Sequence, residues 1–190
     1  MEKNPDTPVV EMDSVEGNKG GKVLLTIHFT TSSFMLAYIR DANTSQSVID
    51  IYEDLYSTLE NETFKRLFPL ILTDIGSEFS NPATIEFDAN GEKRTQIFYC
   101  DPASPHQKGA IENNHEMIRR IVPQGKSFDK YGQNHIKLMM DHINSYARKK
   151  LNDKSPHSLF SFLHGTDVLR KLDAKLISPN DIILKPELLR

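Results

Sequence analysis

The N-terminal part of the chain has its hydrophobic residues in three short runs with the pattern of β-strands. Residues 9–13 alternate apolar and acidic side chains, residues 22–29 are apolar for most of their length, and residues 34–39 form a third apolar run. A glycine-rich turn at residues 17–21 separates the first two runs. Short connections between successive strands are typical of antiparallel pairing, so we expect a three-stranded meander.

After residue 43 the pattern changes to helices and strands in alternation. Asn43 and Thr44 are suitable N-caps for a long helix that reaches about Phe68. The inner stripe of this helix would consist of Val48, Ile51, Leu55 and Leu59. The helix leads to residues 70–72, a short apolar run typical of a buried strand, and together they predict a right-handed β-α-β unit.

The following part of the chain predicts a hairpin and several helices. Residues 84–87 and 94–99 would be the arms of a β-hairpin around Asn90-Gly91, a strong short-range hairpin signal. Helices are then expected over residues 110–120, about 133–151 and 156–163. The inward side of the second helix would hold Ile136, Met139, Met140, Ile143 and Tyr146.

This order of elements predicts an α/β fold with a central mixed β-sheet flanked by helices. At 190 residues the chain is long enough for one domain with a buried core. We expect that domain over residues 1–165, followed by a tail of short helical pieces over residues 166–190. The single cysteine, Cys100, excludes a disulfide framework and is typical of a reducing cytoplasm. No apolar run is long enough to span a membrane, and the polar first residues are not those of a signal peptide.

The charges are unevenly distributed along the chain, although the formal net charge is only −3. Residues 1–62 contain 4 Lys and Arg against 11 Asp and Glu, whereas residues 106–190 contain 15 against 9. The acidic part could bind metal ions and the basic part could contact phosphates. The same distribution also fits two solvated faces without a ligand.

Two polar motifs follow predicted structural elements. Thr73-Asp74-Ile75-Gly76-Ser77-Glu78-Phe79 places Asp74 at the end of a buried strand, where α/β sheets bind ligands. Further on, Pro102 and Pro105 restrict the loop before a helix that has Glu112 in its first turn. An acidic residue in that position can simply stabilise the helix dipole, so Glu112 alone does not indicate a site.

Together these motifs resemble the catalytic core of DDE transposases and retroviral integrases, and most closely that of the IS30-like bacterial insertion-sequence transposases. The second motif of the resemblance is Tyr99-x-Asp101-Pro102-x-Ser104-Pro105-x-Gln107-Lys108-Gly109-x-x-Glu112-Asn113. The resemblance covers roughly residues 9–165 and implies a ribonuclease-H-like fold. It also implies metal-dependent DNA strand transfer by in-line phosphoryl transfer, in the transposition or integration of a mobile element. Two departures are Ile75, where the family usually has Asn, and a slightly longer spacing from Asp74 to Glu112.

The resemblance implies a catalytic and metal-binding triad of Asp13, Asp74 and Glu112. Asp74 and Glu112 lie within the matched motifs, whereas Asp13 is placed by strand order. Glu11, on the same strand face, is an alternative to Asp13. The cofactor would be Mg²⁺ or Mn²⁺, with two ions when DNA is bound, because hard cations prefer oxygen ligands. Candidate contacts to DNA phosphates, each of which could also be a solvated residue, are Lys108, Arg119 and Arg120.

The implied partners are double-stranded DNA, as element ends and as target, and further copies of the chain in a homodimer or higher oligomer, with no membrane. The protein would be bacterial, cytoplasmic and nucleoid-associated. No helix-turn-helix precedes the core, so we expect a catalytic domain without an end-recognition domain. Two other functions stay open: a ribonuclease-H-like nuclease that acts by hydrolysis alone, and a non-catalytic DNA-binding or assembly module in which Ile75 marks lost activity. His115 is expected to be packed or exposed rather than a ligand.

Overall fold

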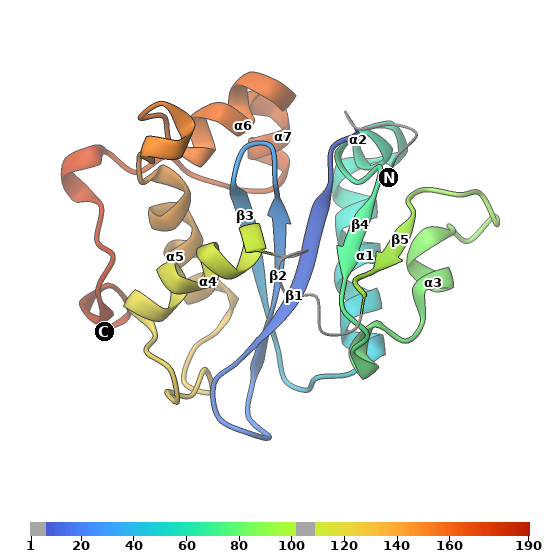
Figure 1. The fold of residues 1–190 in the computed structure, drawn as a ribbon, viewed down its shortest axis with the longest axis horizontal. Helices are drawn as coiled ribbons and strands as arrows, with labels where there is room; N and C mark the ends of the chain where they lie inside the picture. The colour runs from blue at the N-terminus through green and yellow to red at the C-terminus, as the bar shows by residue number, and fades with distance from the viewer. Residues whose placement is uncertain (1–6, 102–108) are drawn as a thin grey trace.

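The computed structural model describes residues 7–101 and 109–190. It consists of a mixed β-sheet with helices on both faces (Figure 1). Within these residues the sheet has five strands in the order β3-β2-β1-β4-β5. The strands are β1 (Val10–Glu16), β2 (Val23–Phe29), β3 (Phe34–Arg40), β4 (Ile71–Thr73) and β5 (Ile97–Tyr99). The first three pair antiparallel, which confirms the predicted meander, and β4 and β5 run parallel to β1.

The helices divide between the two faces of the sheet, and each face has its own hydrophobic core. The helices are α1 (Ser45–Leu59), α2 (Asn61–Leu67), α3 (Pro82–Glu86), α4 (Gly109–Ile121), α5 (Gln133–Ser145), α6 (Pro156–His164) and α7 (Thr166–Lys171). Met12 and Ile71 belong to the core that includes α1, whereas Val15 and Leu24 belong to the core with α4 and α5. Figure 1 accordingly shows α4 in front of the sheet and α1 behind it. In the described part of the chain no helix combines the length and the apolar composition needed to cross a membrane.

Two of the predicted helices are shorter than expected. Thr44 caps α1 as predicted, because its side chain accepts a hydrogen bond from the backbone of Ser47. The helix ends at Leu59 since Glu60 has a φ of 65°, which residues other than glycine rarely adopt, and α2 follows as a separate helix. Likewise α5 ends at Ser145 rather than near residue 151, and Tyr146 is exposed rather than buried.

The prediction of a β-hairpin over residues 84–99 is wrong for its first arm, residues 84–87, which is not a strand. Pro82–Glu86 forms the short helix α3, with Ile85 buried in the core beside α1. Proline is favoured in the first turn of a helix because its missing N–H would have no partner there. The turn itself lies where it was predicted: Gly91 has a φ of 79°, and Phe87 forms an antiparallel bridge with Lys93 across it.

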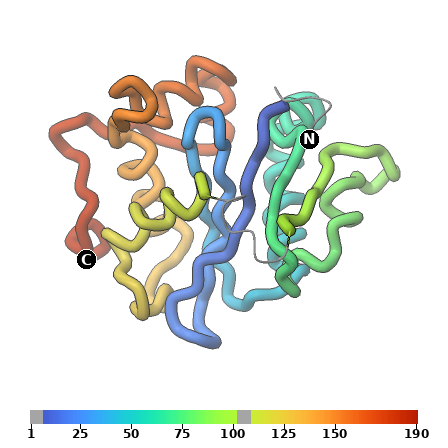
Figure 2. Tube along the Cα trace, viewed as in Figure 1, coloured from blue at the N-terminus to red at the C-terminus, as the bar shows by residue number. Residues whose placement is uncertain are grey.

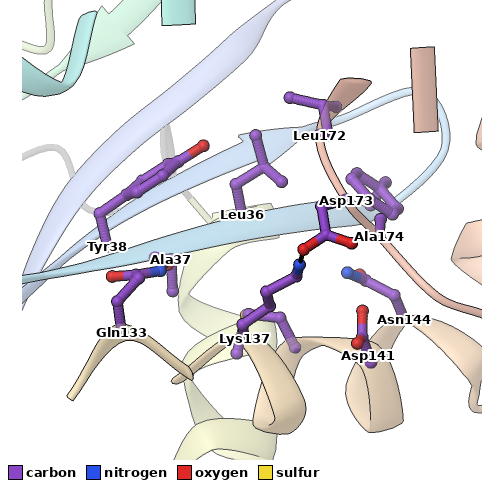
Figure 3. A pocket seen from close by; sticks show the side chains of 12 residues that line it. Leu36, Ala37, Tyr38, Gln133, Lys137, Asp141, Asn144, Leu172, Asp173 and Ala174 are labelled. Atoms are coloured by element: carbon purple, nitrogen blue, oxygen red, sulfur yellow. Dashed lines mark hydrogen bonds and ion pairs between the residues drawn. The ribbon is translucent and has the colours of Figure 1, made fainter. Parts of the chain in front are cut away.

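Two amide side chains of α5 cover the outer edge of β3, which is an edge strand of the sheet. Asn144 accepts a hydrogen bond from the Met35 N–H at 3.0 Å and donates to the Met35 carbonyl at 2.8 Å. Gln133 accepts from the Ile39 N–H at 2.9 Å and donates to the Ala37 carbonyl at 3.0 Å. Figure 3 shows both amides beside the strand. They supply hydrogen bonds that a further strand would otherwise make.

The segment after α7 packs along α5 and follows one side of the molecule to the C-terminus (Figure 2). Three of its backbone N–H groups donate to buried side chains of α5: Lys175 to Asp141, Ile177 to Ser145, and Ile183 to His142. Lys137 also forms an ion pair with Asp173 beside a pocket of about 160 Å³ between β3, α5 and this segment (Figure 3). Specific polar contacts from residues 173–183 therefore hold the segment after α7 against α5.

Candidate active site

Asp13 lies on β1 and Asp74 directly follows the neighbouring parallel strand β4, so the register of the two strands, continued past β4, would bring both to the same face of the sheet. β1 and β4 pair with Val10 opposite Ile71 and Glu11 opposite Leu72. Continuing this register by two residues sets Asp13 opposite Asp74, just beyond the end of β4. Side chains at paired positions point to the same face of a sheet. Asp13 is half-buried and Asp74 is exposed.

The helix α4 covers this face of the sheet and carries Glu112. His115 Nε2 lies 2.8 Å from Thr26 Oγ1, and Arg119 donates to the Glu16 carbonyl at 2.7 Å. This side of α4 therefore faces β1 and β2. At about 100° per residue, Glu112 projects from the same side of the helix as Arg119. Glu112 is exposed, so its carboxylate is accessible on the face that carries the two aspartates.

Asp13, Asp74 and Glu112 are residue types that bind divalent cations, although in the described residues their side chains do not form a ready metal site. In residues 7–101 and 109–190 no three His, Cys, Asp or Glu side chains lie close enough together to hold a metal ion. Asp13 and Asp74 nevertheless offer carboxylate oxygens from adjacent strands, and Glu112 offers a third from the helix above. Hard cations such as Mg²⁺ prefer such oxygens and keep several waters, so they need few protein ligands.

The turn after Asp74 is tightly built, and it exposes the residue that departs from the family pattern. Ile75 is 71% exposed, so it is not packed in the core. A Cβ on Gly76 would lie 2.5 Å from Glu78 Oε2, so a larger residue there would require the Glu78 side chain to move. Phe79, which ends the turn, is buried in the core on the α1 face of the sheet. The turn is thus anchored at Phe79 while Asp74 and Ile75 face solvent.

A polar network holds this turn against β1, and the sequence analysis did not predict it. Arg40 donates to Ser14 Oγ and to Asn43 Oδ1, both at 2.8 Å, and Asn43 donates to Glu78 Oε1 at 3.1 Å. Burial alone would raise the pKa of Glu78, but hydrogen bonds from its own backbone, Ser14 and Asn43, with the charge of Arg40, lower it. Burial also lowers the pKa of Arg40 to about 10. The network links the residue after Asp13 to the turn after Asp74.

The predicted basic residues differ in how they are held. Arg119 is half-buried by its hydrogen bond to β1, and burial lowers its pKa, whereas Arg120 is exposed. Lys108 lies outside the described residues. The sequence analysis missed Arg148, which donates to Asn114 of α4 and whose pKa burial lowers to about 10. Arg148 brings positive charge from the end of α5 to the helix that carries Glu112.

A groove of about 440 Å³ lies on the sheet near Asp13 and Asp74. It is lined by residues of β1, β4 and β5 and by three residues that flank the strands: Val9, Glu11, Thr30, Leu72, Phe98, Tyr99 and Asp101. Glu11 and Leu72 are paired residues of β1 and β4, two positions before Asp13 and Asp74. The groove therefore lies next to the two aspartates on the α4 face.

Several named proteins are similar in sequence to the chain, although no family model matches it. The chain is 29% identical over 151 residues to the ORF3 protein of Spiroplasma virus SpV1-R8A2 B, which is named as an integrase, covering 80% of the chain and 45% of that protein. It is 27% identical over 149 residues to the transposase InsI of insertion sequence element IS30A from Escherichia coli (strain K12), covering 78% and 37%. It is 26% identical over 151 residues to the transposase of IS4351 from Bacteroides fragilis, covering 80% and 44%. The chain thus spans less than half the length of these curated relatives.

The fold is also similar to that of a chain in a solved viral intasome. The cryo-EM structure of the simian T-cell lymphotropic virus intasome in complex with PP2A regulatory subunit B56 gamma aligns with a TM-score of 0.61 and 16% identity, over 80% of this chain and 53% of that chain. With the mixed five-stranded sheet of the described residues, this likeness confirms the predicted ribonuclease-H-like α/β fold. The chain is a relative of integrases and of the transposases of IS30 and other insertion sequences.

Proposed function

We propose that the chain catalyses metal-dependent DNA strand transfer in the transposition or integration of a mobile element. The observation that carries this proposal is the parallel register of β1 and β4, which pairs Glu11 with Leu72 and, if continued by two residues, would set Asp13 opposite Asp74 on the face that α4 covers. With Glu112, these residues would hold Mg²⁺ or Mn²⁺, as two ions when DNA is bound. Bound ions would activate the attacking oxygen and stabilise the leaving oxygen of the scissile phosphate.

The neighbouring residues would orient the carboxylates and the DNA. The network of Arg40, Ser14, Asn43 and Glu78 would keep the turn after Asp74 fixed against β1. The DNA would be double-stranded, as element ends and target, and its phosphates would lie along the exposed basic side of α4. The names of the relatives support a role on DNA, and the likeness to a chain of an intasome, which is an assembly, supports a homodimer or higher oligomer. The bacterial insertion sequences among the relatives support a bacterial cytoplasm as the location, where the protein would act at the nucleoid.

The proposal is tested by the products that the chain makes from DNA. Duplexes with free 3′-hydroxyl ends, taken from the DNA that borders its own coding sequence, are incubated with a supercoiled target plasmid and Mn²⁺. We expect joined products, and we expect Glu112→Gln to reduce them by about 100-fold or more, because a ligand should matter at least as much as an outer-shell partner. Glu116→Gln, the same change one turn later on α4, is the matched control and should retain joining.

Other products would point to other functions. Nicked plasmid without joined ends, lost in Glu112→Gln, would indicate a nuclease that uses the same residues for hydrolysis. DNA binding without either product would indicate the non-catalytic module. Joining that survives Glu112→Gln unchanged would exclude Glu112 from the site.

The candidate phosphate contacts Lys108 and Arg120 predict a specific salt dependence of DNA binding. Lys108→Ala and Arg120→Ala should each lower the slope of log K against log salt by about one, because each loses one phosphate contact. Both should weaken all DNA sequences alike. Lys65→Ala, on α2 at the opposite face, is the control that should leave the slope unchanged. The test is to measure DNA affinity over a range of salt concentrations. If the slopes of the variants equal that of the parent chain, Lys108 and Arg120 do not contact phosphates and are solvated surface residues.

A further inference from the structure

Glu11 is a carboxylate in a position where charged side chains rarely occur. It lies on β1 two residues before Asp13, is only 5% exposed, and is opposite the fully buried His28 in the strand pairing. A buried acidic residue needs hydrogen bonds to offset the loss of water. The partner of Glu11 comes from a distant part of the chain. Its Oε2 accepts a hydrogen bond from the backbone N–H of Ile111 at 2.6 Å.

This contact fixes the first turn of α4. The first N–H groups of a helix have no partner within the helix, and a carboxylate satisfies one of them with a charge that suits the helix dipole. Ile111 is itself buried, so the contact is shielded from water. The next residue in α4 is Glu112. Its position above the sheet therefore depends on the bond that its neighbour makes to β1.

The carboxylate of Glu11 is enclosed by buried groups on two sides. His28 Nδ1 lies 3.5 Å from the same Oε2. Burial lowers the pKa of His28, and the charges of Lys150 and Arg148 act in the same direction against the opposing effect of Glu11. Glu11 thus has an imidazole on one side and a helix backbone on the other.

We infer that Glu11 is a positioning residue: through Ile111 it holds the first turn of α4 against β1 and so sets where Glu112 stands relative to Asp13 and Asp74. This inference rests on the proposed function, since it concerns the placement of a proposed metal ligand. It also separates Glu11 from Asp13 in role, because one oxygen of Glu11 binds the helix that carries the third carboxylate.

The test compares three replacements of Glu11 by two measurements. Hydrogen exchange of the α4 amides is followed without metal, and the Kd for Mn²⁺ is measured by titration. Glu11→Ala should speed exchange at the first turn of α4 and raise the Kd for Mn²⁺ about tenfold, equivalent to about 1.4 kcal/mol. Glu11→Asp, which keeps the charge but is too short to reach Ile111, should do the same. Glu11→Gln should stay within about threefold of the parent chain in both, because its amide oxygen still accepts the bond.

Asn144→Ala is the matched control for a loss of stability alone. It removes a buried pair of hydrogen bonds between α5 and β3, neither of which carries a proposed metal ligand, and should leave the Kd for Mn²⁺ unchanged. If Glu11→Gln weakens Mn²⁺ binding as much as Asp13→Asn does, Glu11 is a metal ligand and the inference fails. It also fails if Glu11→Asp leaves both measurements unchanged. If the parent chain binds no Mn²⁺, the proposed function fails instead, and unaltered α4 exchange in Glu11→Ala and Glu11→Asp would then still overturn the inference.

Discussion

Asp74→Asn is expected to weaken Mn²⁺ binding more than about 100-fold and to remove DNA joining. The change keeps the shape of the side chain but takes away its negative charge and one of its metal-binding oxygens. Loss of an outer-shell partner of a metal site already costs about 10–100-fold, so loss of a ligand should cost at least as much. Metal titration and the joining assay measure the two effects separately. Because Asp74 is exposed, Asp74→Asn should not unfold the protein, so unfolding would not explain either result.

Asp54→Asn gives the same chemical change at an exposed position on α1, behind the sheet, and should have no effect on either measurement. Asp13→Asn should behave like Asp74→Asn, because the β1–β4 register, continued by two residues, would put the two carboxylates on one face. Mn²⁺ binding that persists in both aspartate variants would show that the metal is bound elsewhere. Binding lost in Asp74→Asn but kept in Asp13→Asn would remove Asp13 from the triad.

Phe160→Ala is expected to lower the free energy of unfolding by about 3–5 kcal/mol, the usual cost of truncating a buried aromatic residue. Phe160 is fully buried on α6 and stacks on Phe34 with 4.3 Å between ring centroids. It also meets the edge of Phe29, at 5.0 Å. Both partners belong to the β2–β3 hairpin, so the ring joins α6 to the sheet. Chemical denaturation with an unchanged m-value measures the loss.

Phe162→Ala provides a control on the same helix, since Phe162 is 84% exposed. A surface substitution of this kind should change the stability by no more than about 0.5 kcal/mol. Alanine is a better helix former than phenylalanine, so helix propensity cannot account for a loss in either variant. Equal losses would therefore mean that the buried contacts of Phe160 contribute no more than those of an exposed ring. A small loss in Phe160→Ala alone would mean that the aromatic cluster closes around the space left behind.

The sequence predicted those parts of the fold that depend on periodicity and on strong local signals. The three-stranded meander, the cap at Thr44 and the helix at residue 156 depend on neighbouring residues, and all were found. The failures came where a local signal was weak. A run as short as residues 84–87 does not distinguish a strand from a helix, and Glu60 gives no sign in the sequence that it will take a positive φ.

The candidate site was predictable only as far as its motifs extend. Asp74 and Glu112 lie in motifs that can be quoted from the sequence, whereas the positions that support them are far away along the chain. Glu11 and Ile111 are 100 residues apart, and Asn43 and Glu78 are 35 apart, so no spacing rule could pair them. Glu11 was considered only as an alternative to Asp13. Its contact with α4 depends on how the helix packs on the sheet.

The amides of Gln133 and Asn144 also bear on how copies of this chain could associate. An uncovered edge strand of seven residues would be a template for strand addition, and so for fibrous aggregation or domain swapping. Because these side chains already occupy backbone groups of Met35, Ala37 and Ile39, β3 is poorly suited to extend its sheet into a neighbouring molecule. The opposite edge, β5, is only three residues long. Association of copies would therefore proceed through helix and loop surfaces, which leaves each sheet closed within its own molecule.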